Sequence, residues 1–443
     1  MKWLRRNGGR LLILAAAALC AFPWADYLTP GTWTPATLKA VLPRLSPLLN
    51  LFGAVAARQW VGWSLFLGFP LLVLAFFKGR VFCWRMCPMG FLAELAGKLN
   101  PWGKGLVRRV PAVNRALALV IVVAAVCGYP LAIWLDPLCI FNGFFAAWRL
   151  PLVWASGATA IGFVVLLALS LLVPNIWCHR LCPLGGLQEA VMDAGNRWRA
   201  RRAAKAGEVA PKVLSGAVAR RTLLAGLPAA VASVAVGRTL GGKAAGGIRP
   251  PGADLTRFNA LCARCGNCMT ACPYQLIHPD FGETGIEGLF SPVLHLRSAC
   301  GHPDDMDSYC FHDCVKCSQV CPTGALRPLD VLTKHATPIG LAVIDRTKCL
   351  AWAKNETCAV CDEYCPYKAV KIEIKGEVSY PSIIADKCRG CGACEAGCPA
   401  DPIAVRVRPL RVEEYGKKLL PSEIDAPEKA AKGEYGDSEN STP

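Results

Sequence analysis

Four groups of four cysteines lie between residues 262 and 398, and every group ends in the pattern Cys-x3-Cys-Pro. The groups are Cys262, Cys265, Cys268 and Cys272; Cys310, Cys314, Cys317 and Cys321; Cys349, Cys358, Cys361 and Cys365; and Cys388, Cys391, Cys394 and Cys398. Three thiolates at short spacing wrap a loop around one face of a 4Fe-4S cube, and the fourth, followed by proline, reaches a second cube. The pattern therefore predicts four 4Fe-4S clusters.

Disulfides and zinc are the other chemistries open to these cysteines. With Cys300 the region holds an odd number of cysteines, whereas a disulfide framework favours an even number. Zinc sites use paired Cys-x2-Cys groups but do not need a fourth cysteine followed by proline. Iron-sulfur clusters are therefore favoured over both. Cys300 stays ambiguous because it could replace Cys310 as a ligand, although the compact run from Cys310 to Cys321 is the better candidate.

The spacing within the groups suggests how they pair. The first and fourth groups are regular and the second and third are irregular, an order that favours nested pairing in two ferredoxin-like modules. The nested ligand sets are Cys262, Cys265 and Cys268 with Cys398; Cys388, Cys391 and Cys394 with Cys272; Cys310, Cys314 and Cys317 with Cys365; and Cys349, Cys358 and Cys361 with Cys321. Sequential pairing is the alternative. Short strands expected at 342–345 and 370–374 fit the βαβ-like setting of ferredoxin modules.

A long apolar half precedes the cysteine groups. The chain carries a net charge of +17, and its basic excess lies before residue 250, as do all tryptophans except Trp352. This distribution suits a membrane protein with aromatic belts better than a nucleic-acid-binding protein. Membrane spans are expected at residues 11–28, 60–77, 116–135, 152–174 and, in a shorter form, 222–237. Basic residues before the first span and after the second and fourth place the N-terminus in the cytoplasm and the cysteine groups outside.

A short signature follows the second span and recurs after the fourth. Residues 82–94 align without gaps to residues 177–189, and both copies contain Cys-x3-Cys-Pro at the cytoplasmic edge, where thiols stay reduced. We expect the copies to face each other about a pseudo-two-fold axis, so that one metal centre binds to Cys83, Cys87, Cys178 and Cys182. An iron-sulfur cluster is favoured there because soft thiolate sets select iron-sulfur, zinc or Cu(I). The alternative is a pair of helix starts with incidental cysteines.

Asp136, at the outer end of the third span, is one of few acidic residues in this half. A loop or capping role is the simpler interpretation, and a proton acceptor beside a quinol head group is the sharper hypothesis. Haem is not expected, because His179 is the only histidine before residue 278 and Cys-x-x-Cys-His is absent. A G-x-G-x-x-G fingerprint after a strand is absent too.

Residues 197–252 join the two halves. The basic stretch 197–215 is expected to lie on anionic lipid. The sequence Ala219-Arg220-Arg221-Thr222-Leu223-Leu224 resembles a twin-arginine export signal, which suits a domain that receives its clusters before export; an ordinary stop-transfer pair of arginines is the alternative. Residues 241–252 are expected to form a flexible tether reaching about 20 Å.

The expected architecture is a polytopic α-helical membrane domain followed by an α+β ferredoxin-like domain with two paired-cluster modules. Its parts are a membrane domain with four transmembrane helices at 1–196, the junction at 197–252, the four-cluster domain at 253–412 and a polar, disordered tail at 413–443.

On these motifs the chain resembles a fusion of two known components. The first 190 residues or so, with four spans and two Cys-x3-Cys-Pro copies, resemble the NapH-type membrane subunit of the periplasmic nitrate reductase system, which is also related to the NosR regulators. Residues 220 to about 405, with the twin arginine and four cysteine groups, resemble its NapG-type (MauM/NapG) polyferredoxin partner. The resemblance implies a quinol dehydrogenase that passes electrons from menaquinol or ubiquinol to periplasmic reductases, often through a multihaem cytochrome. The usual NapH type has a further ferredoxin segment after its last span that is absent here, which puts a cytoplasmic electron branch in doubt.

The leading hypothesis is therefore a quinol-oxidising electron-transfer protein of the bacterial inner membrane, with its ferredoxin domain in the periplasm. Its expected partners are the lipid bilayer, the quinone pool, a periplasmic cytochrome or reductase and a further membrane subunit. A maturation factor that reduces a periplasmic metalloenzyme is the alternative; a sensor would need a regulatory domain, which the sequence does not reveal. One difficulty is that a hydrocarbon core of about 30 Å would separate a cluster at the cytoplasmic edge from the outer domain. Either quinol is oxidised near Asp136 or another subunit bridges that gap.

Overall fold

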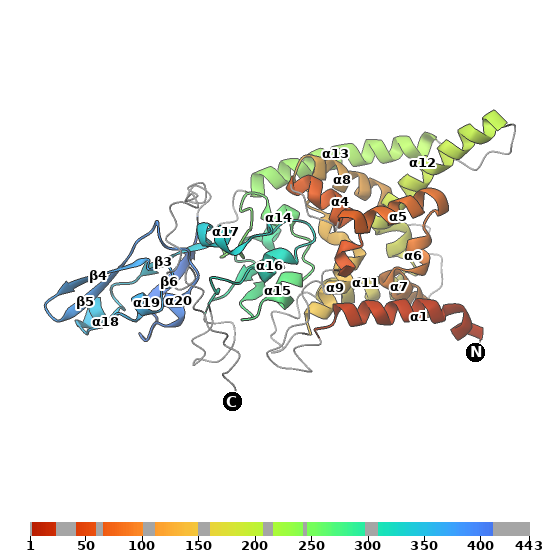
Figure 1. Cartoon of the computed structure of the whole chain (residues 1–443). Coiled ribbons are helices and arrows are strands. Elements are labelled where there is room, and N and C mark those ends of the chain that lie inside the picture. The colour runs from red at the N-terminus through yellow and green to blue at the C-terminus, as the bar shows by residue number, and fades with distance from the viewer. Residues whose placement is uncertain are drawn as a thin grey trace.

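The computed structural model describes residues 2–23, 41–58, 65–100, 111–148, 160–206, 216–241, 246–296 and 309–410. Cys300 and the tail predicted at 413–443 lie outside these residues, as do parts of the first, second and fourth predicted spans. A helical half and a cysteine-rich half follow one another end to end, with strands β4 (Val370–Lys375) and β5 (Val378–Ile383) farthest from the helices (Figure 1).

The helical half packs around one apolar core. Its longer helices are α1 (Lys2–Ala21), α4 (Pro47–Ala57), α5 (Leu65–Lys78), α7 (Pro88–Lys98), α8 (Asn114–Val126), α9 (Pro137–Ala146), α11 (Ile161–Leu172), α12 (Pro183–Ala206) and α13 (Gly216–Gly241). Side chains from many of them meet in the core, among them Leu48, Met89, Ile121, Phe141 and Leu184. Because α8 packs against α4, α12 and α13, the junction helices belong to this half.

Each predicted span coincides at least in part with a helix, namely α1, α5, α8, α11 and α13. Within the described residues, however, one segment is long and apolar enough to cross a membrane by length and composition, Thr222–Thr239 of α13. The other apolar helices have 10 to 17 residues, fewer than the roughly 20 that a bilayer needs. Helix length alone therefore does not establish four further spans.

Two helices occupy stretches that the predicted spans leave as loops. Helix α4 begins after Ser46 and α9 after Asp136, and in both the first helical residue is proline. An N-cap residue followed by proline is a recognised helix start, since proline lacks the N–H that would stay unbonded there. These two helices form the face of the helical half that meets the cysteine-rich half (Figure 1).

Over its described residues, the cysteine-rich half contains three two-stranded antiparallel sheets and short helices between cysteine loops. The strand pairs are β1 (Ile277–Pro279) with β2 (Pro292–Leu294), β3 (Gly340–Ile344) with β6 (Val405–Pro409), and β4 with β5. The predicted strands at 342–345 and 370–374 thus correspond to β3 and β4. Strand β3 pairs with β6 from Gly340 against Pro409 to Ile344 against Val405. This pairing brings the segment that follows the fourth cysteine group back to the segment that precedes the third.

The glycine-rich stretch predicted as a flexible tether is packed over its described part, residues 246–252. The backbone of Ile248 bridges to Leu294 beside β2, and Arg249 is only 2% exposed. The Arg249 guanidinium donates hydrogen bonds to Ser291, Asn259 and other oxygens at 2.8 to 2.9 Å. A buried charge whose two terminal nitrogens donate four hydrogen bonds fixes this segment in place. The prediction of a free tether is therefore wrong for these residues.

Candidate iron-sulfur sites

The first three-cysteine loop is completed by a cysteine of the second group. Cys262, Cys265 and Cys268 line one small cavity together with Cys321 and its following residue Pro322. Cys268 lies on the short helix α15 (Asn267–Ala271) and interacts electrostatically above all with the other three thiols. We call this set site 1. The nested hypothesis, which gives Cys398 to this loop, is wrong because the loop of the second group packs here instead.

The remaining cysteine of the first group completes a second site. Cys317, on the short helix α16 (Lys316–Gln319), interacts with Cys310, Cys314 and Cys272. These four residues form site 2. Helices α15 and α16 pack against each other, so the first two groups exchange their last cysteines within one module.

The third and fourth groups repeat this exchange. Cys394, on α20 (Ala393–Ala396), interacts with Cys388, Cys391 and Cys365, which form site 3. Cys361, on α19 (Val360–Glu363), interacts with Cys349, Cys358 and Cys398, which form site 4. Pairing is sequential throughout, which was the alternative hypothesis, and all sixteen predicted cysteines fall into one of the four sets.

The residues fit 4Fe-4S clusters on the chemistry of the donor sets. Burial raises the pKa of Cys361 and that of Cys391 to about 12, so these thiols stay protonated at neutral pH unless iron stabilises the thiolate. Backbone N–H groups point at ligand sulfurs, from Leu326 to Cys321 at 3.4 Å and from Ala369 to Cys365 at 3.2 Å. Among the described residues no three metal-ligating side chains gather around a single ion position, whereas a cluster takes its four thiolates at separate irons.

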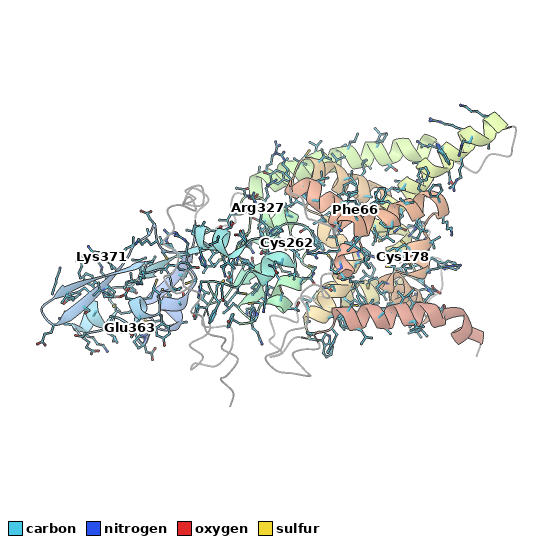
Figure 2. All side chains as sticks on the ribbon, viewed as in Figure 1. Phe66, Cys178, Cys262, Arg327, Glu363 and Lys371 are labelled. Atoms are coloured by element: carbon cyan, nitrogen blue, oxygen red, sulfur yellow. The ribbon has the colours of Figure 1, made fainter. Side chains whose placement is uncertain are left out.

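The four sites follow one another along the long axis of the molecule. Site 1 adjoins the helical half, since α15 packs on α9. Sites 2 and 3 touch through the backbone hydrogen bond from Cys310 N to Cys391 O at 2.9 Å. Cys394 of site 3 interacts with Cys361 of site 4, and α19 and α20 pack together. Figure 2 places Cys178 in the helical half, Cys262 at the near end of the cysteine-rich half and Glu363 toward its far end.

Aromatic side chains fill the junction between sites 2 and 3. Tyr367 is buried and interacts with both Cys391 and Cys310. Its ring is covered by the guanidinium of Arg389 at 6.0 Å and meets the ring of His335 at 5.7 Å. The two modules therefore pack against each other through the buried Tyr367 side chain.

The repeated signature in the helical half forms two matching structures. Cys87 precedes α7 and Cys182 precedes α12, and each sulfur accepts a hydrogen bond at 3.4 Å from the glycine N–H three residues on. The backbone N–H of Cys87 bonds to Phe82 O and that of Cys182 to Trp177 O, at 2.9 and 2.8 Å. The equal spacing of these bonds shows that the sequence repeat is a structural repeat.

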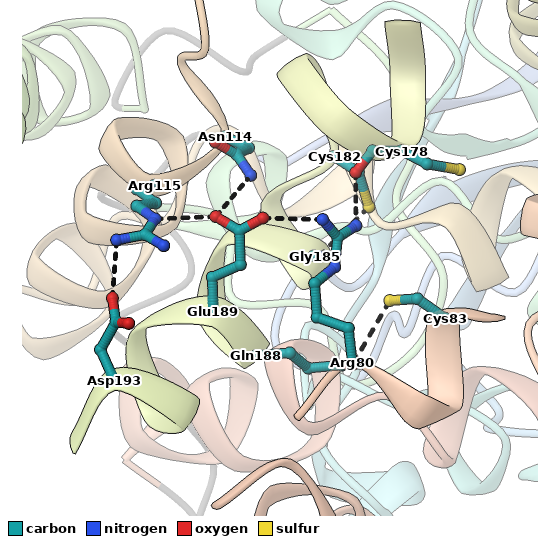
Figure 3. A network of polar contacts seen from close by, with 10 residues as sticks. All are labelled: Arg80, Cys83, Asn114, Arg115, Cys178, Cys182, Gly185, Gln188, Glu189 and Asp193. Atoms are coloured by element: carbon teal, nitrogen blue, oxygen red, sulfur yellow. Dashed lines mark hydrogen bonds and ion pairs between the residues drawn. The ribbon is translucent and has the colours of Figure 1, made fainter. Parts of the chain in front are cut away.

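The two copies bring their four thiols together. Cys182 interacts electrostatically with Cys83, Cys178 and Cys87. Figure 3 shows three of the four, Cys83, Cys178 and Cys182, around Arg80. We call the four residues the thiol quartet. The predicted association of the copies is therefore observed, while the metal that they bind stays a prediction.

An ion-pair network supports the quartet. Arg80 bonds to Glu189 at 2.7 Å and to the carbonyl oxygen of Cys178 at 2.5 Å (Figure 3). Glu189 also pairs with Arg115 at 2.7 Å, and Arg115 with Asp193 at 2.7 Å. These groups are less than one fifth exposed, so each charge depends on its partners. The network ties the loop before Cys83 to the backbone of the other copy.

Asp136 caps the helix that faces site 1. It is fully buried, and its carboxylate accepts hydrogen bonds from the N–H groups of Leu138 and Cys139 and from the hydroxyl of Ser46. The capping interpretation is therefore confirmed, and a proton-accepting role stays a prediction. The carboxylate also lies close enough to Cys83 and Cys87 for their charges to interact.

Two residues of α9 that sequence reasoning missed touch site 1 directly. The Cys139 thiol is in hydrogen-bonding contact with the ligand thiol of Cys265. The Asn142 side chain donates to Cys265 O and to Asn267 Oδ1, both at 2.7 Å. The available signal was the Asp-Pro helix start at residue 136, which places both residues on one short helix.

The gap expected between the quartet and the outer domain is smaller than the sequence suggests. Asp136 interacts with quartet thiols on one side and caps the helix that carries Cys139 on the other. Helix α9 therefore connects the quartet to site 1 through packed protein. A bridging subunit, the alternative to quinol oxidation near Asp136, stays a prediction.

Family models for 4Fe-4S domains match parts of both halves of the chain. A family model described as a 4Fe-4S dicluster domain matches residues 261–326, which span sites 1 and 2, and one described as a 4Fe-4S binding domain matches residues 59–109 and 156–202, which contain the quartet. The methylamine utilization ferredoxin-type protein MauM of Methylophilus methylotrophus is 35% identical over 38% of this chain and 73% of its own length. The chain belongs to the MauM/NapG family of ferredoxin-type proteins.

Other MauM/NapG ferredoxins match over a similar share of the chain. MauM of Methylorubrum extorquens is 36% identical over 40% of this chain and 78% of its own length. The ferredoxin-type protein NapG of Escherichia coli is 30% identical over 37% of this chain and 71% of its own length. No solved structure matches. The expected NapG-like polyferredoxin is thus confirmed as an iron-sulfur electron-transfer protein, while the NapH-like identity of the helical half stays a prediction.

Proposed function

We propose that this MauM/NapG-type ferredoxin is the electron-transfer component of a membrane quinol dehydrogenase. The observation that carries the proposal is the linear order of cysteine sites, from the quartet in the helical half through sites 1, 2 and 3 to site 4 at the far end. When bound, each cluster would accept and release one electron at a time. The protein residues hold the sites in sequence.

Unpartnered apolar surface supports a membrane location for the helical half. Phe69 on α5 is 59% exposed, Val165 on α11 is 58% exposed, and Leu224 on α13 is 76% exposed. Large apolar surface of this kind on several helices marks contact with lipid or protein. We infer that these faces meet the acyl chains of the bacterial inner membrane, with α13 as one full span.

The direction of transfer follows from this placement. The quartet and the helical half lie on the side of the quinone pool, so quinol is the donor, and site 4 is nearest to a soluble acceptor. Under the predicted topology the acceptor is a periplasmic cytochrome or reductase. The similarity to NapG supports a reductase of the nitrate system as one candidate, and the similarity to MauM leaves the acceptor's identity open to another periplasmic redox protein.

The decisive experiment is anaerobic stopped-flow reduction of the full chain in lipid nanodiscs by menadiol. We expect the iron-sulfur absorbance to bleach and EPR signals of reduced clusters to appear over repeated turnovers when an acceptor is added. Clusters that accept electrons from dithionite but not from menadiol would contradict the proposal. That result would favour the alternative, a maturation factor that reduces a periplasmic metalloenzyme.

A further inference from the structure

A cavity of about 740 Å³ opens directly beside the thiol quartet. Its wall includes Cys83 and Cys178, the first cysteine of each signature. The second cysteines, Cys87 and Cys182, are buried in the core behind them. The quartet therefore presents one side to protein and the other to a space large enough for a small organic molecule. Ligand pockets in proteins have volumes of about 300 to 1,000 Å³.

The charged groups in this cavity converge from separate elements. Glu94 of α7 accepts hydrogen bonds from Arg10 of α1 at 2.8 Å and from Lys98 at 2.9 Å. The Arg10 Nε–H is buried and has no hydrogen-bond partner. Arg80 and His179 also line the wall. A buried donor without a protein partner beside a carboxylate leaves hydrogen-bonding capacity unused, and it matches a ligand that carries an oxygen able to donate and accept.

The ring of Trp84 suits packing against a planar ligand. Trp84 lines the cavity together with Cys83 and is 60% exposed. An adjoining cavity of about 590 Å³ shares Arg10, Trp84 and Glu94 and is also lined by Asn7, Gly9 and Ile13 of α1. An aromatic face beside a few convergent polar groups is the usual composition of a site for a planar organic ligand.

We propose that this cavity binds the head group of the quinol. Glu94 accepts a hydrogen bond from one ring hydroxyl, Arg10 Nε donates to the oxygen of the same or the opposite position, and Trp84 packs against the ring. The adjoining cavity along α1 receives the start of the isoprenoid tail, which packs against Ile13. The inference rests on the proposed function and relocates the quinol from the Asp136 region to the wall formed by Cys83 and Cys178.

The test uses the full chain with its clusters in lipid nanodiscs and two probes. One probe is the quinol analogue 2-heptyl-4-hydroxyquinoline N-oxide, whose fluorescence is quenched on binding; the other is a photoreactive azidoquinone whose attachment sites are mapped by mass spectrometry. We expect labelling within residues 84–98 or 174–179. We expect Glu94→Gln to weaken analogue binding at least tenfold, because the charged hydrogen-bond acceptor is lost.

Control variants separate binding from folding. Glu373→Gln removes an exposed carboxylate of β4 that pairs with Lys371, and we expect it to leave analogue binding unchanged. Trp84→Ala removes an exposed ring without a core role and is expected to weaken binding as Glu94→Gln does, with the EPR spectrum of the dithionite-reduced protein unchanged.

Labelling confined to residues 136–148, with full binding in Glu94→Gln, would overturn this location while leaving the proposed function intact. Reduction by menadiol that fails in the wild-type protein would overturn the proposed function itself.

Discussion

At the scale of single residues, the proline-terminated cysteines decide which sites form. Cys272, Cys321, Cys365 and Cys398 each leave the loop of their own group and complete the site of the neighbouring group. The exchange places two sites close together in each module. It also makes each of these four residues diagnostic for the pairing, because its loss removes a ligand from another group.

Replacing Cys398 by alanine is expected to damage site 4 and to leave sites 1 and 2 intact. The reason is that Cys398 joins Cys349, Cys358 and Cys361. The measurement is iron content together with EPR of the reduced protein, with a loss of about four irons per chain. Cys20→Ala, at a half-buried cysteine of α1, serves as the control. Loss of the signal of site 1 instead would restore nested pairing.

The ligands themselves were predictable from the sequence, but their partners were not. Cysteine spacing is a local property, and it identifies the loops that surround each site. Pairing depends on which loops pack together, for example α15 against α16, and both arrangements satisfy the same spacing. The contribution of Cys139 was hidden for a similar reason, since its contact with Cys265 joins residues that lie far apart in the chain.

At the scale of elements, α9 and the loop of site 1 form the main joint between the halves. Gly266 has a φ of +76°, and a Cβ added there would come within 2.4 Å of the Ala146 Cβ. Nearby, a Cβ added to Gly53 on α4 would come within 2.9 Å of the Thr323 Cα. Such close approaches leave no room for a side chain, so the joint depends on small residues on both sides.

Gly266→Ala is expected to lower stability more than the matched variant Gly376→Ala. Both glycines have positive φ, so both variants incur a backbone cost of about 1 to 2 kcal/mol. Gly376 has nothing within 4 Å of an added Cβ, whereas Gly266→Ala also overpacks the joint at about 1 to 3 kcal/mol. Thermal unfolding in nanodiscs measures the difference. An equal loss of stability in the two variants would show that the joint accommodates the added methyl group without an energetic penalty.

The apolar pattern of the sequence predicted the positions of five helices. It did not predict α4 and α9, which lie next to site 1. The predicted spans coincide with α1, α5, α8, α11 and α13, because apolar runs must be buried in protein or lipid. Helices α4 and α9 are short and lie between spans, so span-scale reasoning treated them as loops. Their N-cap and proline starts were visible in the sequence, but only packing shows that α9 faces site 1.

At the scale of the whole molecule, the sites form a single file. Site 1 meets the helical half, site 2 touches site 3 through Cys310 and Cys391, and site 4 lies beyond them. In such an arrangement every electron that reaches the far end passes each site in turn. The position of a broken site therefore determines how many others a quinol donor can reduce.

Cys365→Ala and Cys349→Ala test this order. The first variant removes a ligand of site 3, so quinol is expected to reduce sites 1 and 2 while site 4 is reached only by dithionite. The second variant removes a ligand of site 4 and is expected to leave reduction of sites 1 to 3 at the wild-type rate. Rapid-freeze EPR during menadiol reduction counts the reduced sites. Fast reduction of site 4 in Cys365→Ala would show a second route.

The pairing of β3 with β6 bears on how the protein is made. A ribosome that has reached residue 387 has already presented complete ligand sets for sites 1 and 2, which need no residue beyond Cys321. Site 3 cannot be completed until Cys388, Cys391 and Cys394 have been synthesised, and site 4 needs Cys398. Strand β3 can pair only after β6 has been made. Cluster insertion during synthesis is therefore expected to finish at sites 1 and 2 first and at site 4 last. Cluster assembly would then follow the same order along the molecule as electron transfer in the finished protein.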